Sequence, residues 1–376
     1  MVLLLWLACA RDSDVRPPPS AGDPTDPPEI PEPERRFDCS GMPQPDPPPL
    51  GGRIALTFDD GPNPLTTPRV LQILEDYQVP ATFFLLGAAV SDPEAWPLVE
   101  EMVANPLFDV GNHSWDHADM AYLSADDVAA EIDDTNALLA TFGVAPRWFR
   151  FPYGDSTCET HDQVTHRGMI VSGWHVDTVD WCYGESGHCS QEDYWRIPDG
   201  FEDDMLGFTL EQAARFDGGV VLMHDIHEST ADALEGLIVA LLAAGFTFTS
   251  LDDAAAFPNL NAGIIPDFPY LGEACDPVAD ACFQNEYLSW CESTDSDGAA
   301  GICTMPCAGT CTDRDGAATT FCMEVAPGAG QCVGQSGPLN GECEALPGTV
   351  EVAADRYVGA SGVEPASAEV CAPSAW

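Results

Sequence analysis

The stretch from Ile54 to Pro62 reads I-A-L-T-F-D-D-G-P. Its large apolar residues recur at every second position as far as Phe58, which is the period of a β-strand. Two adjacent carboxylates, Asp59 and Asp60, follow the strand and precede the turn-forming pair Gly61-Pro62. Because neighbouring side chains on an extended chain point to opposite sides, one acid could bind a metal while the other exchanges protons. A plain solvated turn has the same pattern, so other segments of the chain must decide between the two interpretations.

From Arg53 to about Leu260, strand-like and helix-like segments alternate. We expect strands at Ile54–Phe58, Ala81–Gly87, Asp109–Gly111, Trp148–Phe151, Met169–Val176, Gly219–Met223 and Phe246–Ser250. We expect helices at Thr67–Tyr77, Pro93–Ala104, Ala125–Phe142, His161–Arg167, Leu210–Phe216 and Ala231–Ala244. Repeated βα units form parallel sheets, and about seven strands are too few for a closed eightfold barrel. The sequence predicts the α/β class and an incomplete (β/α) barrel, with reactive groups at the rim formed by the C-terminal strand ends.

The charge of the chain limits its partners. The 376 residues include 62 acidic and 13 basic side chains, for a formal charge of −49. A field of this sign repels nucleic acids and anionic membrane surfaces, so we expect neither as a partner. Because the acids are spread along the whole chain, they indicate solubility rather than an acidic binding face.

Fifteen cysteines indicate an oxidising compartment. Sequence proximity favours a disulfide between Cys182 and Cys189, which leaves Cys39 for Cys158. Ten further cysteines follow residue 270 and predict a disulfide-stapled module, because such a stretch cannot build much hydrophobic core. The alternative is a zinc module, whose sign would be repeated C-x-x-C pairs rather than the C-x-x-x-C spacing present here.

The beginning of the chain has the composition of a leader and a tether. The apolar residues 2–8 are too short to span a bilayer and resemble the end of a signal peptide. Ala8 before Cys9 resembles a bacterial lipoprotein cleavage site, but Trp6 departs from that pattern, so lipidation and ordinary secretion both stay open. Residues 10–50 are rich in proline and acids and favour an extended tether. We expect a secreted or cell-envelope protein, attached to a membrane only through a lipid on Cys9.

The segment Asn112–His117, N-H-S-W-D-H, follows an expected strand and therefore lies at the rim. His113 and His117 are four residues apart, so one helical turn would place both imidazoles on one side. Together with one rim carboxylate they would make a three-ligand site with open positions, as in catalytic zinc centres. A metal there lowers the pKa of bound water and polarises a carbonyl group.

Three further segments with polar side chains follow expected strands: R-F-P-Y-G at Arg150–Gly154, D-T-V-D-W at Asp177–Trp181 and V-V-L-M-H-D at Val220–Asp225. Arg150 could pair with a rim carboxylate and keep it ionised, and the loop after it could donate an N–H to an oxyanion. His224 suits a general acid, with Asp180 raising its pKa and fixing its tautomer. Each segment also has a purely structural interpretation, as a solvated arginine or a core histidine.

In this order, the motifs T-F-D-D-G-P, H-S-x-x-H, R-x-P-Y-G, D-x-x-D-W and L-x-H resemble those of polysaccharide deacetylases of the NodB-homology type, the family-four carbohydrate esterases. The resemblance covers Arg53 to about Leu260, a little over half of the chain. It implies a distorted (β/α) barrel and a divalent metal, usually zinc, with cobalt or another ion as an alternative. It also implies hydrolysis of N-acetyl groups on amino sugars or of O-acetyl groups on xylan.

The same resemblance implies roles for the residues that match the motifs. Asp59 would be the general base that deprotonates water, and Arg150 would hold it. The implied metal ligands are Asp60, His113 and His117.

On the substrate side, the resemblance implies that His224 protonates the leaving amine, with Asp180 behind it. The backbone amide of Tyr153 would help to bind the oxyanion, and Leu222 would line the acetyl pocket. From its place beside Asp180, we interpret Trp181 as a wall of the substrate site.

The stretch between Trp181 and Gly218 is longer than the family pattern and contains Cys182, Cys189, Tyr194 and Trp195. We interpret it as an insertion that covers part of the cleft and shapes substrate choice; a structural disulfide loop is the alternative. Five histidines match no motif and are expected to be surface or core residues: His161, His166, His175, His188 and His227. His227 is the candidate exception because it lies near His224.

These observations predict a monomeric, metal-dependent deacetylase of an acetylated polysaccharide. Its expected parts are a signal-like segment and linker at residues 1–50, a deacetylase domain at residues 51–262 and a Cys-rich module at residues 267–376. One rival is a non-catalytic carbohydrate-binding or adhesion protein on the same scaffold, which would not need Asp59 or His224. Another is a non-haem iron oxygenase, whose usual antiparallel sheets do not fit the βα alternation. Peptidoglycan, chitin-like oligomers, exopolysaccharide and acetylxylan all stay open as substrates.

Overall fold

The computed structural model describes residues 46–376 except for residues 185, 191, 192, 195, 196, 199, 265–268, 278–281, 283–288, 296, 297, 308, 312–316, 359–364 and 375. The leader, Cys9, Cys39, most of the tether and Trp195 therefore lie outside the described residues. Across the described part, none of the helices combines the length and apolarity needed to cross a membrane.

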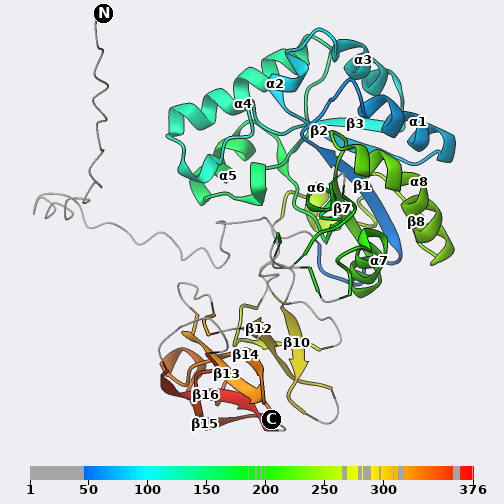
Figure 1. Cartoon of the computed structure of the whole chain (residues 1–376). Helices are drawn as coiled ribbons and strands as arrows, with labels where there is room; N and C mark the ends of the chain where they lie inside the picture. Colours follow the sequence, from blue (N-terminus) through cyan, green and yellow to red (C-terminus); the bar gives the residue numbers. More distant parts are fainter. Residues whose placement is uncertain are drawn as a thin grey trace, which may run out of the picture. The chain divides into compact units, whose positions relative to one another are not determined.

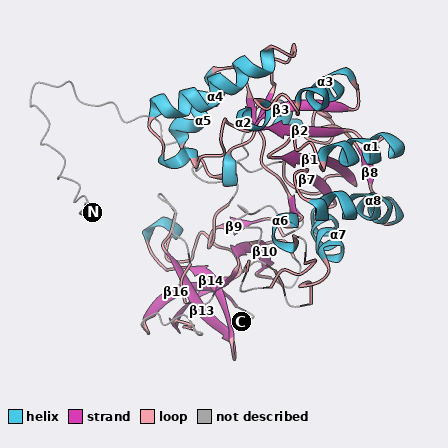
Figure 2. Ribbon diagram, turned by 45° about the horizontal axis from the view of Figure 1, so that its top comes forward, coloured by secondary structure: helices cyan, strands magenta, loops and turns pink. Residues whose placement is uncertain are grey.

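A parallel sheet forms the centre of the first part of the chain (Figure 1). Its order is β5 (Ile170–Val171), β4 (Trp148–Phe149), β3 (Phe108–Asn112), β2 (Ala81–Leu85), β1 (Arg53–Asp59), β7 (Gly218–His224) and β6 (Val176–Asp177), and β8 (Thr247–Phe248) also pairs with β1. The helices are α1 (Thr67–Tyr77), α2 (Gly87–Val90), α3 (Trp96–Ala104), α4 (Ala125–Ala140), α5 (Cys158–His166), α6 (Asp180–Tyr183), α7 (Met205–Phe216), α8 (Glu228–Ala243) and α9 (Pro258–Asn261). Figure 2 shows α1, α3 and α8 along the outer side of the strands. The predicted incomplete (β/α) barrel is confirmed.

Strand β1 lies in the middle of this sheet and is buried on both faces. The alternation in its sequence does not mark an exposed face, because Ala55 and Thr57 are as buried as their larger neighbours. The buried Thr57 hydroxyl donates a hydrogen bond to the Val221 carbonyl at 2.6 Å. Double burial is typical of parallel strands that are covered by helices. The register with β7 places Asp59 opposite His224. A residue near the start of the βα series therefore lies beside a residue near its end, at the rim.

Two local predictions are wrong. The apolar segment Met169–Val176 was expected to be one strand, but it forms β5 and β6 at opposite ends of the strand order. Between them, the Ser172 N–H donates to the Phe149 carbonyl of β4 and the His175 N–H donates to the Val220 carbonyl of β7, so the chain crosses from one end of the strand order to the other. The strand expected to continue to Gly87 ends at Leu85, and Gly87 begins the short helix α2.

Residues 46–50, which the sequence assigns to the linker, pack against this first part. The carboxylate of Asp46 accepts the backbone N–H groups of Asn259 and Leu260 at the start of α9, at 2.8 and 3.0 Å. Its carbonyl contacts His175 Nε2 at 2.8 Å, and Leu50 is in the hydrophobic core. This short segment therefore closes the base of the sheet.

The second part consists of antiparallel strands, which the fading periodicity of its sequence did not indicate. They are β9 (Ala274–Cys275), β10 (Trp290–Ser293), β11 (Gly301–Thr304), β12 (Pro306–Cys307), β13 (Thr320–Ala326), β14 (Ala329–Gly334), β15 (Thr349–Asp355) and β16 (Ser367–Pro373). Its ten cysteines pair as Cys275–Cys291, Cys282–Cys303, Cys307–Cys322, Cys311–Cys332 and Cys343–Cys371. The predicted disulfide module is confirmed, and the zinc alternative is wrong because the sulfurs are bonded to one another.

Candidate active site

Side chains from four strand ends meet at the rim. Asp59 is the last residue of β1, His113 follows β3, Arg150 follows β4 and His224 is the last residue of β7. Because these strands are parallel, their C-terminal ends lie on one edge of the sheet. Segments that are far apart in the sequence therefore form one site.

A buried arginine fixes the first acid. Arg150 Nη1 donates to Asp59 Oδ1 and to Thr57 Oγ1, both at 2.8 Å. The rest of its guanidinium donates to the carbonyls of Ser172 and Gly173 at 3.2 and 3.1 Å, and the group lies over the Phe84 ring. Arg150 is fully buried, so its charge is held in place and acts on Asp59 with little screening by solvent.

The second acid faces two imidazoles. Asp60 Oδ1 lies 3.4 Å from Nε2 of His113 and 3.4 Å from Nε2 of His117. This oxygen is buried and has no hydrogen-bond partner among the described residues. Burial raises the pKa of Asp60, but the adjacent His113 outweighs it and holds that pKa well below its usual value. An ionised oxygen without a donor beside two ring nitrogens fits a divalent cation, and the three atoms are close enough to share one ion.

The two histidines come together on a loop, and the predicted helical turn is wrong. Ser114 and His117 adopt left-handed backbone conformations, with φ of 72° and 64°. His113 Nδ1 contacts the Arg150 carbonyl at 2.8 Å, which leaves Nε2 free to face Asp60. Sequence analysis missed Asn112, whose buried Oδ1 accepts the Ser114 N–H at 2.7 Å and shapes this loop.

On β7, His224 pairs with a buried carboxylate. Asp180 Oδ1 lies 2.7 Å from His224 Nδ1. Its Oδ2 accepts the backbone N–H of His224 at 2.7 Å and the Thr230 hydroxyl at 2.5 Å. Burial alone would lower the pKa of His224, but Asp180 and then the acids at the rim raise it to about 10. The sequence did not indicate Thr230, which becomes a neighbour only when α8 packs beside α6.

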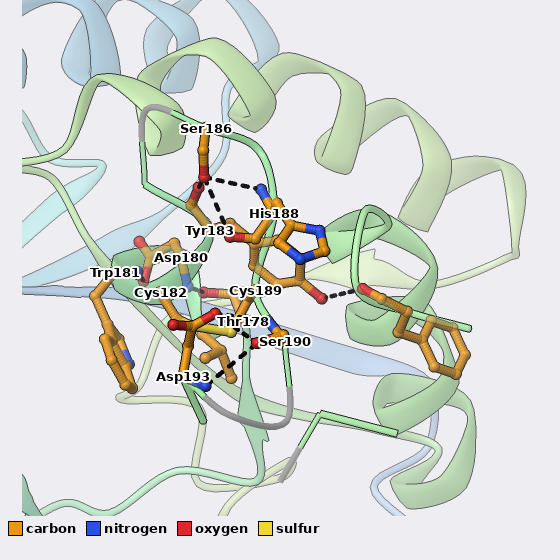
Figure 3. Close-up of a disulfide and its surroundings, with 12 residues drawn as sticks. Thr178, Asp180, Trp181, Cys182, Tyr183, Ser186, His188, Cys189, Ser190 and Asp193 are labelled. Carbon is orange, nitrogen blue, oxygen red and sulfur yellow. Dashed lines mark hydrogen bonds between the residues drawn. A yellow bond between two sulfur atoms is a disulfide. The ribbon is translucent and has the colours of Figure 1, made fainter. Parts of the chain in front are cut away.

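Asp180 belongs to a single helical turn that a disulfide fixes. The turn, α6, also contains Trp181 and Cys182 (Figure 3), and the predicted Cys182–Cys189 bond is present. Trp181 is 42% exposed, and its ring lies 5.0 Å from that of Tyr194, edge to face. The other predicted pair is half described: Cys158 is disulfide-bonded, and Cys39 lies outside the described residues. A role of this loop in substrate choice stays a prediction.

The remaining predicted residues also lie near the rim. Tyr153 has a left-handed backbone (φ 58°), and its exposed ring is 4.5 Å from that of His117. Leu222 is buried on β7, two residues before His224. His227 is the one unassigned histidine described beside this group, with its ring 5.9 Å from that of His224. His175 is a core residue, as expected, with its Nδ1 accepting the Val220 N–H at 2.9 Å.

Sequence analysis assigned no role to Asp225. Its carboxylate is fully buried, accepts the Thr67 hydroxyl and packs so closely on Gly61 that a Cβ there would overlap it. Burial raises the pKa of Asp225 to about 7. The glycine after the two rim acids is therefore required for space, and no local sequence signal reveals this because Asp225 directly follows β7, far from Gly61 in the sequence.

Comparison with known proteins agrees with this geometry. Residues 47–171 match the polysaccharide deacetylase family. Peptidoglycan-N-acetylglucosamine deacetylase PgdA of Listeria monocytogenes is 34% identical over 202 residues, which are 54% of this chain but only 38% of that protein. A chitooligosaccharide deacetylase of Sinorhizobium fredii is 32% identical over 213 residues, which are 53% of this chain and 89% of that protein.

Among solved structures, a CE4-family pseudoenzyme from Bacillus anthracis shares 27% sequence identity at a TM-score of 0.45. The match covers 55% of this chain and 66% of that one.

Proposed function

The chain belongs to the polysaccharide deacetylase family, and from this premise we propose that it is a metal-dependent hydrolase that removes N-acetyl groups from amino sugars of a cell-wall or extracellular polysaccharide. The observation that carries the proposal is the buried Asp60 oxygen, which has no hydrogen-bond donor within the described part of the chain and faces His113 and His117. A base fixed by an arginine lies on one side of this group, and an imidazole paired with a carboxylate lies nearby.

Asp60, His113 and His117 are the proposed ligands of a divalent cation. Two imidazoles and one carboxylate suit zinc best, and cobalt or another divalent ion fits the same donors. When bound, the cation supplies Lewis-acid activation of a water molecule and of the acetyl carbonyl.

Asp59 is the proposed general base. Because Arg150 Nη1 donates to Asp59 Oδ1 at 2.8 Å, the carboxylate is held in one orientation. The other oxygen, Oδ2, lies 3.7 Å from His113 Nε2 and so borders the metal ligands. It is placed to accept the proton of a water molecule that attacks the acetyl carbon.

His224 is the proposed general acid. With its pKa raised to about 10, the ring carries a proton at neutral pH, and Asp180 stabilises the imidazolium form. In the reaction, the carbonyl carbon gains the water oxygen and loses the amine nitrogen. Asp59 takes one proton from the water, His224 gives one to the nitrogen, and the products are a free amine and acetic acid, which loses its remaining proton to solvent to become acetate.

Three residues are proposed to position the substrate. The backbone N–H of Tyr153 would donate to the developing oxyanion. Leu222 would contact the acetyl methyl group, since it lies two residues before His224 on the same strand. The exposed indole of Trp181 would pack against a sugar ring.

The setting of the protein is proposed on the same grounds. Disulfides in both described parts support a secreted or cell-envelope location, and the relatives named above act on peptidoglycan or chitooligosaccharides. A lipid anchor on Cys9, a monomeric state and the division into residues 1–50, 51–262 and 267–376 complete the proposal.

The test combines metal binding with acetate release. The full chain is stripped with a chelator, reloaded with zinc and assayed on peptidoglycan, chitooligosaccharides and acetylxylan. We expect Asp60→Ala to lose both zinc binding and acetate release, because the cation would lose its only charged ligand. The control is Glu100→Ala, which removes an exposed acid on α3 and should change neither quantity. Full acetate release by metal-free Asp60→Ala would overturn the mechanism.

A further inference from the structure

The loop with His113 and His117 has an unfavourable backbone. Two of its non-glycine residues, Ser114 and His117, have positive φ angles. Such conformations are uncommon for residues with a Cβ and persist only where the surroundings enforce them. The same loop supplies two of the three proposed metal ligands, so whatever enforces its conformation also sets the distance between the two rings.

Helix α4 contacts this loop through side chains on one face. Glu131 Oε2 accepts the backbone N–H groups of Trp115 and Asp116, at 2.7 and 3.2 Å. Four residues later, the Thr135 hydroxyl donates to the Ser114 carbonyl at 2.9 Å. Residues four apart on a helix lie on the same face, so α4 presents an acceptor and a donor to the loop together.

The contacts of Glu131 differ in kind from those of α2. The backbone N–H groups of Gly87 and Ala88 donate to the carbonyls of Ser114 and Trp115, at 3.0 and 2.7 Å. These N–H groups of α2 therefore hold two carbonyl acceptors of the loop. Glu131 instead holds two of the loop's donors, the N–H groups of Trp115 and Asp116, while Asn112 Oδ1 accepts that of Ser114. A carboxylate that accepts two N–H groups forms stronger hydrogen bonds than a neutral acceptor.

We propose that Glu131 is a positioning residue of the metal site: one of its carboxylate oxygens holds the N–H groups of Trp115 and Asp116, between His113 and His117, and thereby sets the affinity for the cation. This inference rests on the proposed function. Among the described residues, the Glu131 carboxylate binds the backbone of Trp115 and Asp116 rather than the proposed ligand atoms, so it acts through the backbone that joins the two ligands.

The test measures zinc affinity of the full chain without substrate, by competition with a chromogenic chelator. We expect Glu131→Ala to weaken zinc binding by about tenfold or more, the range seen when partners that orient metal ligands are removed. Glu131→Gln should recover most of this loss, because its amide oxygen can accept the same two N–H groups. Asp134→Ala is the matched control: it removes an exposed acid from the same helix and should leave zinc affinity unchanged.

Zinc affinity of folded Glu131→Ala within twofold of the wild type would overturn the inference, since a purely structural contact would change stability alone. If Glu131→Ala does not fold, Glu131→Asp replaces it, because shortening the side chain withdraws the oxygen from both N–H groups. A wild-type chain that binds no divalent cation would refute the proposed function itself. A wild type that binds zinc and a Glu131 variant that binds it equally well would refute this inference alone.

Discussion

Replacing Asp180 with asparagine tests the proposed acid directly. The change keeps the shape of the side chain and removes the charge that lies 2.7 Å from His224 Nδ1. In the present protein, burial lowers the pKa of His224 while Asp180 and the rim acids raise it to about 10. A bound cation would offset the charge of the rim acids, so Asp180 is the main group that keeps the imidazole protonated. We therefore expect the pKa of His224 in Asp180→Asn to fall to or below its ordinary 6.5.

The size of the effect follows from the fraction of His224 that is protonated. At pH 8, an imidazole with a pKa of about 10 is about 99% protonated, and one with a pKa of 6.5 is about 3% protonated. A general acid works only in its protonated form, so activity is lost as the pH rises through its pKa. Asp180→Asn should therefore lose about 30-fold in kcat/KM at pH 8, and much less at pH 6.

The assay is the pH profile of kcat/KM for acetate release, recorded from pH 5.5 to 10 at saturating zinc. The alkaline limb should move to lower pH in Asp180→Asn, while zinc content stays normal because Asp180 contacts none of the proposed ligands. Thr230→Val is the control, since it removes a neutral donor to Asp180 Oδ2 and leaves the charge. Equal loss at every pH would refute the reasoning and would make Asp180 a purely structural residue.

Two further predictions concern the base of the sheet and the disulfide loop. Burial lowers the pKa of His175 to about 4. Below pH 6.5, the unfolded chain therefore binds a proton at this residue that the folded chain does not bind. The free energy of unfolding should fall by about 2 kcal/mol more in the wild type than in His175→Gln between pH 7.5 and 5. Urea titrations at the two pH values measure this, and parallel losses would contradict it. Replacing Cys182 and Cys189 together with serine should raise KM for the polysaccharide several-fold, because the turn with Trp181 loses its cross-link, and should leave zinc affinity intact; an unchanged KM would count against a substrate role for this loop.

Local sequence patterns predicted correctly those elements whose tertiary contacts favour the same structure as the pattern does. The helix at Thr67–Tyr77 begins and ends where its apolar spacing indicates, and the helix expected from Ala125 begins there, with the Ser124 side chain accepting the Asp127 N–H. The prediction of a single strand at Met169–Val176 is wrong because an apolar run indicates only that its residues are buried. It says nothing about which edge of the sheet each half joins, and that depends on the register of β7 with β6.

The same limit applies to the site. The family resemblance grouped Asp60 with His113 and His117, and the three side chains do lie close together. The four-residue spacing of the histidines, however, fits a helical turn and a loop equally well. The choice between them is made by contacts from elsewhere in the chain, above all Glu131 on α4 and the N–H groups of α2. Asp225 is a still stronger case, because its importance depends entirely on the pairing of β7 with β1.

The different surroundings of Asp59 and Asp60, on which their proposed roles rest, have a cause that strand alternation only approximates. Asp59 remains in β1, and its register opposite His224 directs it to Arg150. Asp60 has already left the extended conformation, with φ of 74°, so its direction comes from the turn and not from the pleat. This turn depends on Gly61, because a Cβ at that position would overlap the Asp225 carboxylate. Two adjacent carboxylates thus reach different partners, Asp59 through the register of β1 with β7 and Asp60 through a turn whose glycine packs against Asp225.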